Sequence, residues 1–185
     1  MLFNKHLDLV GKHAFLSASG YHWINYEDEK LDETFKNAQA AALGSALHDF
    51  AHQAVSLRIK LPKVKKTLNL YVNDVIGHRM ITEQILYYSD NCFGTADAIS
   101  FKNNILRIFD LKTGVTRTSV NQLLVYAALF CLEYNVKPGS IRFDLRIYKD
   151  DEVQMYDTDV EDVLRIMDTI IRFDQRIESI KNGGA

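Results

Sequence analysis

The sequence of 185 residues contains only 2 cysteines and 2 prolines, and each shortage excludes a class of protein. Cys92 and Cys131 lack the spacing of a metal site, so we expect both to be small buried residues. With few prolines, 9 glycines, 47% hydrophobic residues and no low-complexity tract, the composition is not that of a disordered protein. We therefore expect one compact domain over residues 1–185.

Long apolar runs are absent as well. No stretch approaches the length of a membrane span, and Lys5, His6 and Asp8 stand where a signal peptide would have its apolar core. We therefore expect no membrane partner and a cytoplasmic protein, in a reducing compartment that suits two unpaired cysteines.

An excess of positive charge is also missing, because the net charge is -2 and the sequence pI is near 6.3. A nucleic-acid surface would therefore have to be local. The one basic concentration lies in residues 58–66, which we interpret as the solvated start of a helix after Pro62, with phosphate contact as the alternative.

A hairpin pattern over residues 93–114 is the most informative feature that is present. Two asparagines at 103–104 favour a two-residue type I′ turn, because Asn accepts a positive φ at low cost. The turn sets a register that pairs Lys102 with Ile105, Phe101 with Leu106 and Ile99 with Ile108. Continued along the strands, that register places Asp97 opposite Asp110 on a mostly apolar face, with Lys112 two residues further on.

Two carboxylates in these positions need compensation. Like charges opposite each other destabilise a sheet, and burial increases the cost. A hard divalent cation bound by carboxylate oxygens would offset the repulsion, and Lys112 would offset part of it. The hairpin therefore predicts a cation site at Asp97 and Asp110.

Apolar periodicity predicts the remaining elements. We expect a short helix start near 16–23, capped by Ser17 or Ser19, and the following elements: helices over about 31–57 and 63–76, a strand over 80–88, the hairpin, a helix over 119–134, strands at 141–147 and 153–156, and an amphipathic helix from 160. The inward residues expected on the first long helix include Phe35, Leu43 and Phe50. The order α, α, βββ, α, ββ, α predicts an α/β (α+β) fold, with one central mixed sheet flanked by helices.

Several polar residues near the hairpin have more than one interpretation. His48 and His52 lie four apart on the first long helix, which suits either metal ligands or packed histidines. Glu83 shares a strand face with apolar neighbours and is either a further ligand, a group behind the ligands or a residue at a sheet edge. Gln122 and Tyr126 form a polar stripe close in sequence to Lys112, or an ordinary surface pair.

Taken in order, these motifs resemble the PD-(D/E)XK nuclease superfamily, in the RecB-like branch that includes phage recombination exonucleases and CRISPR adaptation nucleases. The motifs are His48 on a helix, Gly94-Thr-Ala-Asp97, Asp110-Leu-Lys112 and Gln122-x-x-x-Tyr126. The resemblance spans residues 44–126, and 16–23 more faintly. It implies a restriction-endonuclease-like core. The family pattern admits Asp or Glu at the position of Asp110.

The resemblance also implies roles for single residues. The implied ligands of Mg²⁺ or Mn²⁺ are His48, Asp97, Asp110 and the backbone carbonyl of Leu111. The implied role of Lys112 is catalysis, in which it would orient or help deprotonate the attacking water and stabilise charge on the phosphate. Gln122 and Tyr126 would hold the helix against the site or contact DNA. From its place on the strand, we also count Glu83 among the DNA-binding or site-support residues. Many relatives carry a glutamate at the position of His52, whose role stays open. Iron–sulfur members use four cysteines, so we expect no iron–sulfur cluster.

The expected function is a metal-dependent deoxyribonuclease that hydrolyses phosphodiester bonds, as an exonuclease of DNA recombination or repair. Its partners would be DNA and a separate recombination or single-strand-binding protein, in the host cytoplasm if the chain is phage-encoded. A non-catalytic DNA-binding or scaffold protein on the same fold is one alternative. A structure-specific endonuclease such as a junction resolvase is another, and an unrelated fold with surface aspartates is the third. The sequence predicts no oligomeric state.

Overall fold

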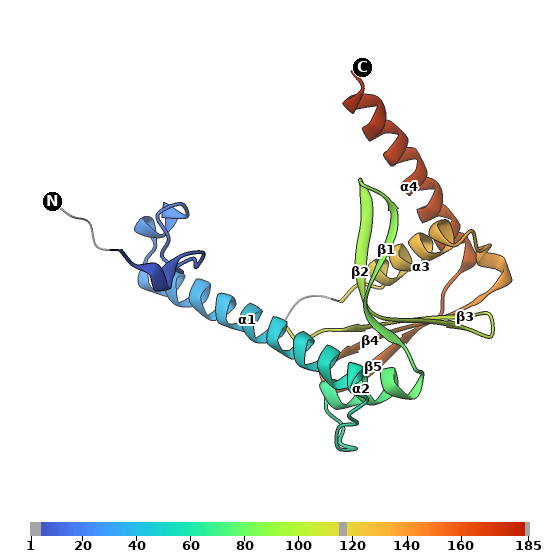
Figure 1. The fold of residues 1–185 in the computed structure, drawn as a ribbon, viewed down its shortest axis with the longest axis horizontal. Coiled ribbons are helices and arrows are strands. Elements are labelled where there is room, and N and C mark those ends of the chain that lie inside the picture. Colours follow the sequence, from blue (N-terminus) through green and yellow to red (C-terminus); the bar gives the residue numbers. More distant parts are fainter. Residues whose placement is uncertain (1–4, 115–117, 184–185) are drawn as a thin grey trace. The chain divides into compact units, whose positions relative to one another are not determined.

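The computed structural model describes residues 5–114 and 118–183 (Figure 1). The chain divides into two compact units, Met1–Leu43 and Gly44–Ala185. Among the described residues, no helix is both long and apolar enough to cross a membrane.

The first unit contains two short 3-10 turns, Leu7–Leu9 and Tyr21–Asn25, and the beginning of helix α1 (Asp28–Ser56). The predicted cap at Ser17 or Ser19 was wrong, because Gly20 is the N-cap of the turn at Tyr21–Asn25 and no side chain caps it; the Ser17 hydroxyl instead accepts a hydrogen bond from the Gly20 N–H at 3.1 Å. The indole N–H of Trp23 donates to the Ser17 carbonyl at 2.8 Å and ties the turn at Tyr21–Asn25 to the residues before it.

The second unit contains the end of α1 and the remaining helices and strands. These are α2 (Thr67–Gly77), β1 (Ile81–Ser89), β2 (Cys92–Lys102), β3 (Ile105–Leu111), α3 (Asn121–Glu133), β4 (Arg142–Lys149), β5 (Glu152–Tyr156) and α4 (Val160–Lys181). The sheet order is β1-β2-β3-β4-β5, in which β3 and β4 are parallel and the other neighbours antiparallel. The predicted element order and the mixed α/β class are confirmed.

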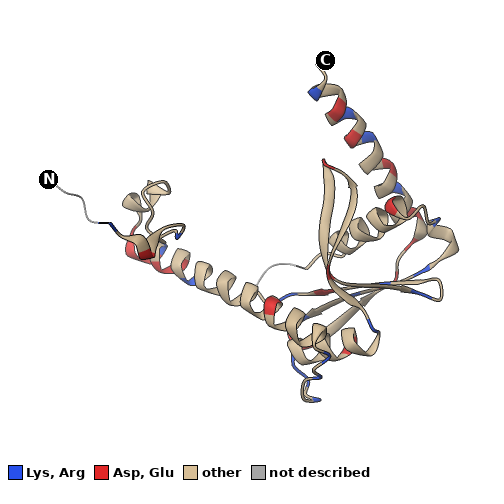
Figure 2. Cartoon of the chain, in the orientation of Figure 1, with Lys and Arg blue, Asp and Glu red and all other residues tan. Residues whose placement is uncertain are grey.

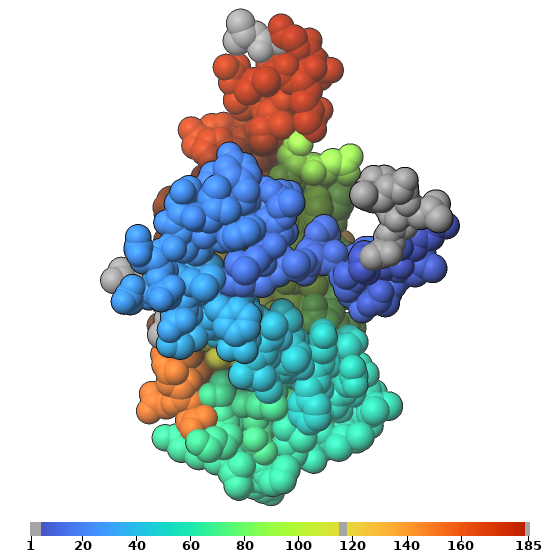
Figure 3. Space-filling view, turned by 90° about the vertical axis from the view of Figure 1, so that its left-hand side faces the viewer, coloured from blue at the N-terminus to red at the C-terminus, as the bar shows by residue number. Residues whose placement is uncertain are grey.

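Helices cover both faces of the sheet. Figure 1 shows α3 and α4 on one face, and α2 with the end of α1 on the other. In Figure 3 the end of α1 and α2 form one continuous surface, drawn in cyan and green. Strand β3 alternates between the two cores, with Leu106 and Ile108 facing α3 and α4 and Phe109 and Leu111 facing α1 and α2. The parallel strands β3 and β4 are joined through α3 and lie between the two helical layers, so both of their faces are covered.

Two predictions about buried faces were wrong. In β4, Phe143, Leu145 and Ile147 alternate with Arg142, Asp144 and Arg146, a pattern that predicts a strand with one buried face. Asp144 and Arg146 are nevertheless partly buried as well, because opposite charges pair there. Arg146 makes bonds of 2.7 and 3.0 Å to the Asp144 carboxylate and lies 4.7 Å from the Phe109 ring centroid. On α1, Phe35, Leu43 and Phe50 are exposed, and the buried residues are the small Ala51, Ala54 and Val55 of its last turns, which pack in the core with Phe109 and Leu111 of the sheet.

Helix α2 begins later than predicted, at Thr67. The basic residues 58–66 form the loop between α1 and α2, visible as blue segments in Figure 2. The helix start is fixed by Asp151 of the β4–β5 turn, whose carboxylate accepts from the Thr67 N–H at 2.9 Å and from Lys66 Nζ at 2.7 Å. Because a distant residue supplies this cap, the local sequence did not indicate it.

Removing this cap should destabilise the protein. We expect Asp151→Ala to lower the free energy of unfolding more than Asp150→Ala does, measured by urea denaturation. Asp150 is a matched control, because both residues have a positive φ, 51° and 61°, and alanine is strained equally at each. Equal losses in the two variants would contradict the capping role.

Candidate metal and catalytic site

The site forms where β2 and β3 separate. The predicted hairpin register is confirmed from Lys102 and Ile105 as far as Ala98 and Phe109, and both turn asparagines have a positive φ, 54° and 56°. The ladder ends there, so the predicted pairing of Asp97 with Asp110 is not reached. Instead, the Leu111 N–H donates to Asp97 Oδ2 at 2.8 Å. The Asp97 carboxylate therefore fills the position that a backbone carbonyl would occupy in a longer ladder.

The hairpin of β1 and β2 also changes faces at this point. Ala96 and Ala98 are two residues apart and should share a face, yet Ala96 belongs to the core under α3 and Ala98 to the core under α1. Their partners Gln84 and Thr82 flank Glu83, whose φ is 54°. This left-handed backbone marks the twist, which turns the Glu83 side chain away from a regular strand position.

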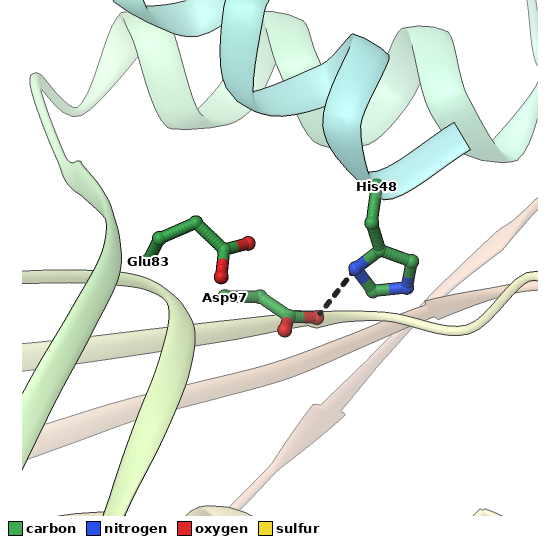
Figure 4. Close-up of side chains that lie close together, drawn as sticks. All are labelled: His48, Glu83 and Asp97. Carbon is green, nitrogen blue, oxygen red and sulfur yellow. Dashed lines mark ion pairs between the residues drawn. The ribbon is translucent and has the colours of Figure 1, made fainter. Parts of the chain in front are cut away.

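The twist brings three side chains from three elements together (Figure 4). His48 of α1, Glu83 of β1 and Asp97 of β2 have ligand atoms that all lie within 4.8 Å of one another. His48 Nδ1 is 3.7 Å from Asp97 Oδ2. Of the predicted ligands, His48 and Asp97 belong to this cluster. Glu83 belongs to it as well, which matches one of its three interpretations, that of a further ligand. We call these residues the His48–Glu83–Asp97 cluster.

Asp110 and Lys112 form a pair beside the cluster. The Asp110 side chain is only 4% exposed, and its two oxygens lie 3.1 and 3.0 Å from Lys112 Nζ. Lys112 Nζ also donates to Gln122 Oε1 at 2.9 Å. The ammonium is therefore held between a buried carboxylate and the first turn of α3.

The predicted Gln122 and Tyr126 stripe continues this network. Gln122 Nε2 donates to the Tyr126 hydroxyl at 3.2 Å, and that hydroxyl donates to the Thr95 carbonyl at 2.6 Å. The Tyr126 ring lies so close to Gly94 that a Cβ at this glycine would be 3.1 Å from a ring carbon. Both polar side chains thus tie α3 to the strand that carries Asp97, rather than forming an ordinary surface pair.

The electrostatics of the site favour a bound cation. Burial, followed by the negative charge of Asp110, raises the pKa of Asp97 to about 6. The Leu111 N–H, His48 and Lys112 act in the opposite direction and lower this pKa. Three carboxylates face one lysine ammonium, which leaves two negative charges when His48 is neutral. A divalent cation would balance them.

Two further residues border the site. His52 Nδ1 lies 2.7 Å from Thr82 Oγ1, a hydrogen bond that fastens α1 to β1, and His52 stands outside the cluster. Tyr71 of α2 is buried, and burial together with the charges of Asp97 and Glu83 raises its pKa. Its hydroxyl therefore stays neutral near the cluster. The helical position of Tyr71 indicates only a core residue, so the sequence carries no signal that places it near the cluster.

The donor set fits a small divalent ion. Oxygen ligands of Mg²⁺ lie about 2.1 Å from the ion, so two ligand atoms can be up to about 4.2 Å apart. The ligand atoms of the cluster lie within 4.8 Å of one another, so the side chains would have to move slightly closer to hold such an ion. Carboxylates suit Mg²⁺ and Mn²⁺, whereas an imidazole suits transition metals, so this set favours Mn²⁺.

The backbone at Glu83 leads to a test that needs no metal. Glycine in a strand is normally less stable than alanine, but at a positive φ alanine pays a steric cost that glycine avoids. We expect Glu83→Gly to be more stable than Glu83→Ala by about 1 kcal/mol in urea denaturation. Ile85, on the same strand, should show the normal order, with Ile85→Ala the more stable. The normal order at both positions would contradict the twist.

Comparison with known proteins adds no relative to this picture. No protein-family model, curated protein or solved structure matches the chain.

Proposed function

We propose that this chain is a divalent-metal-dependent DNA nuclease with a restriction-endonuclease-like core of the PD-(D/E)XK type. The observation that carries the proposal is the His48–Glu83–Asp97 cluster beside the Asp110–Lys112 pair. Phosphodiester hydrolysis needs an activated water and a way to offset charge on the phosphate oxygens, and these two groups of residues are suited to supply both.

Each residue has a role that follows from its contacts. His48, Glu83 and Asp97 would hold Mn²⁺ or Mg²⁺, with Asp110 as the adjacent carboxylate. A divalent cation there supplies Lewis acidity and lowers the pKa of a water molecule. Lys112 presents a fixed positive charge, because Asp110 and Gln122 both bind its Nζ, and this charge would orient the phosphate.

The network behind Lys112 limits its motion. Lys112 is hydrogen-bonded to Gln122, and Gln122 is hydrogen-bonded to Tyr126. The Tyr126 hydroxyl donates to the Thr95 carbonyl on the strand that carries Asp97. The ammonium and the cluster are therefore held in one frame, which is the arrangement that a preorganised catalytic site requires. We extend the proposal to an exonuclease of DNA recombination or repair that acts in the cytoplasm with a separate partner protein.

A digestion assay tests the proposal. End-labelled linear duplex, single strands and covalently closed circles are incubated with the protein in Mn²⁺, Mg²⁺ or EDTA. We expect linear DNA to be degraded with either metal, most strongly with Mn²⁺, and to survive in EDTA, while circles stay intact because an exonuclease needs an end. Asp97→Asn should be inactive, and Asp157→Asn, on the loop before α4, should match the wild type.

Three results would change the conclusion. Degradation in EDTA, or by Asp97→Asn, would refute a metal-dependent site at this cluster. Cleavage of circles would reassign the protein as an endonuclease. Binding of DNA without degradation in any metal would favour a non-catalytic protein.

A further inference from the structure

The β1–β2 hairpin has an exposed aromatic surface beyond the cluster. Tyr87 and Phe93 pair across the two strands, with ring centroids 6.5 Å apart and an interplanar angle of 27°. They are 45% and 62% exposed, and the next pair, Ile85 and Thr95, is exposed too. On the opposite face of the hairpin, Leu86 and Ala96 are buried and pack in the core with residues of α3.

This surface continues directly from the metal cluster. Tyr87 follows Glu83 by four residues, and Phe93 precedes Asp97 by four, so both rings lie about 13 Å along their strands from the cluster. On this hairpin Phe93 lies on the face opposite Leu86 and Ala96, which pack under α3, and Asp97 follows directly after Ala96 at the twist. A DNA strand held at the cluster would therefore reach these rings within a few nucleotides, since stacked nucleotides rise about 3.4 Å each.

The ring of Tyr87 is also held in place. Its hydroxyl donates to Asp90 Oδ1 at 3.0 Å, and its backbone N–H donates to Glu133 Oε2 at 2.9 Å. Little side-chain freedom is then lost when a flat group settles on the ring.

The size of the surface distinguishes between occupants. An aromatic side chain buries about 150–250 Å² in full, so the two partly exposed rings offer on the order of 200 Å². A stable protein interface needs about 800 Å² on each partner. The two rings alone therefore do not make such an interface, and their area suits flat groups such as nucleobases.

We propose that Tyr87 and Phe93 form a stacking platform for unpaired bases of the substrate strand, which makes a single strand or a frayed duplex end the preferred substrate. This inference rests on the proposed function and specifies its substrate. Aromatic rings bind bases of any sequence, because every base has a π-face.

The test measures binding of a labelled 20-nucleotide oligothymidine by fluorescence anisotropy. Ca²⁺ replaces Mg²⁺, and strand integrity is checked on a gel. We expect Tyr87→Ala/Phe93→Ala to bind at least about fivefold more weakly than the wild type. Tyr87→Phe/Phe93→Tyr, which keeps both rings, should retain wild-type affinity. The matched control is Tyr134→Ala/Phe173→Ala, which removes two rings that are 52% and 55% exposed on other elements.

An abasic strand of the same length and charge separates stacking from other effects. The platform variant and the wild type should bind it equally, since no base remains to stack. The platform would be overturned if Tyr87→Ala/Phe93→Ala lost the same affinity for oligothymidine and for the abasic strand, or lost affinity for neither. It would also be overturned if this variant changed the mass of the protein in sedimentation while its affinity for oligothymidine stayed unchanged. Digestion that persists in the platform variant with wild-type affinity would overturn the platform alone and leave the nuclease proposal standing.

Discussion

Replacing Asp97 by asparagine is expected to stabilise the metal-free protein at neutral pH while abolishing metal binding. The folded protein raises the pKa of Asp97 from 3.8 to about 6, so folding favours the protonated carboxyl group. Below about pH 4 the Asp97 carboxyl group is protonated in both the folded and the unfolded state, so its raised pKa does not lower the stability of the protein. As the pH rises towards 6, the unfolded chain releases its proton first and stability falls, by roughly 3 kcal/mol in total.

Asparagine removes this penalty, because it is neutral and its Oδ1 can still accept the Leu111 N–H. The stability difference between Asp97→Asn and the wild type should therefore grow between pH 4 and 6 and then stay constant. Urea denaturation in EDTA across pH 4–8 measures it, with Asp157→Asn as the flat control. Isothermal titration with Mn²⁺ should show affinity reduced by more than about 100-fold, since the loss of a direct ligand exceeds that of an outer partner. A less stable Asp97→Asn at pH 7 would contradict the prediction.

Replacing Lys112 by alanine is expected to cause the largest loss of stability. Asp110 is 4% exposed and has Lys112 as its ion-pair partner. Breaking a buried pair leaves an uncompensated charge, and the cost is about 3–5 kcal/mol. Equilibrium unfolding measures the loss, and nuclease activity should vanish as well.

A double variant separates stability from catalysis. Lys112→Ala/Asp110→Asn removes both charges, so it should recover most of the lost stability while activity stays absent. Recovery of activity with stability would mean that Lys112 acts only through the fold. A single Lys112→Ala variant within about 0.5 kcal/mol of the wild type would show that Asp110 does not need its partner.

The local parts of the site could be predicted from the sequence. The two asparagines at 103–104 fixed a register that brought Asp97 and Asp110 to the same end of the hairpin, and the spacing of Gln122 and Tyr126 placed them near Lys112. These inferences need only a turn type and the periods of strands and helices.

The twist at Glu83 could not be predicted in this way. A glutamate inside a strand carries no signal for a positive φ, since Gly or Asn is the usual marker. A regular strand would have left Glu83 in line with Ile81 and Ile85, both of which are exposed. The contacts of Asp151 and His52 were also missed, because long-range partners have no local pattern.

The cap on α2 has a consequence for the order of folding. Thr67 and Asp151 are separated by 84 positions in the chain, and closing such a long loop is costly before other contacts form. The first turn of α2 should therefore become protected only after the β4–β5 turn has formed. Ribosome-bound chains that end before Asp151 would carry the residues of α2 without their cap.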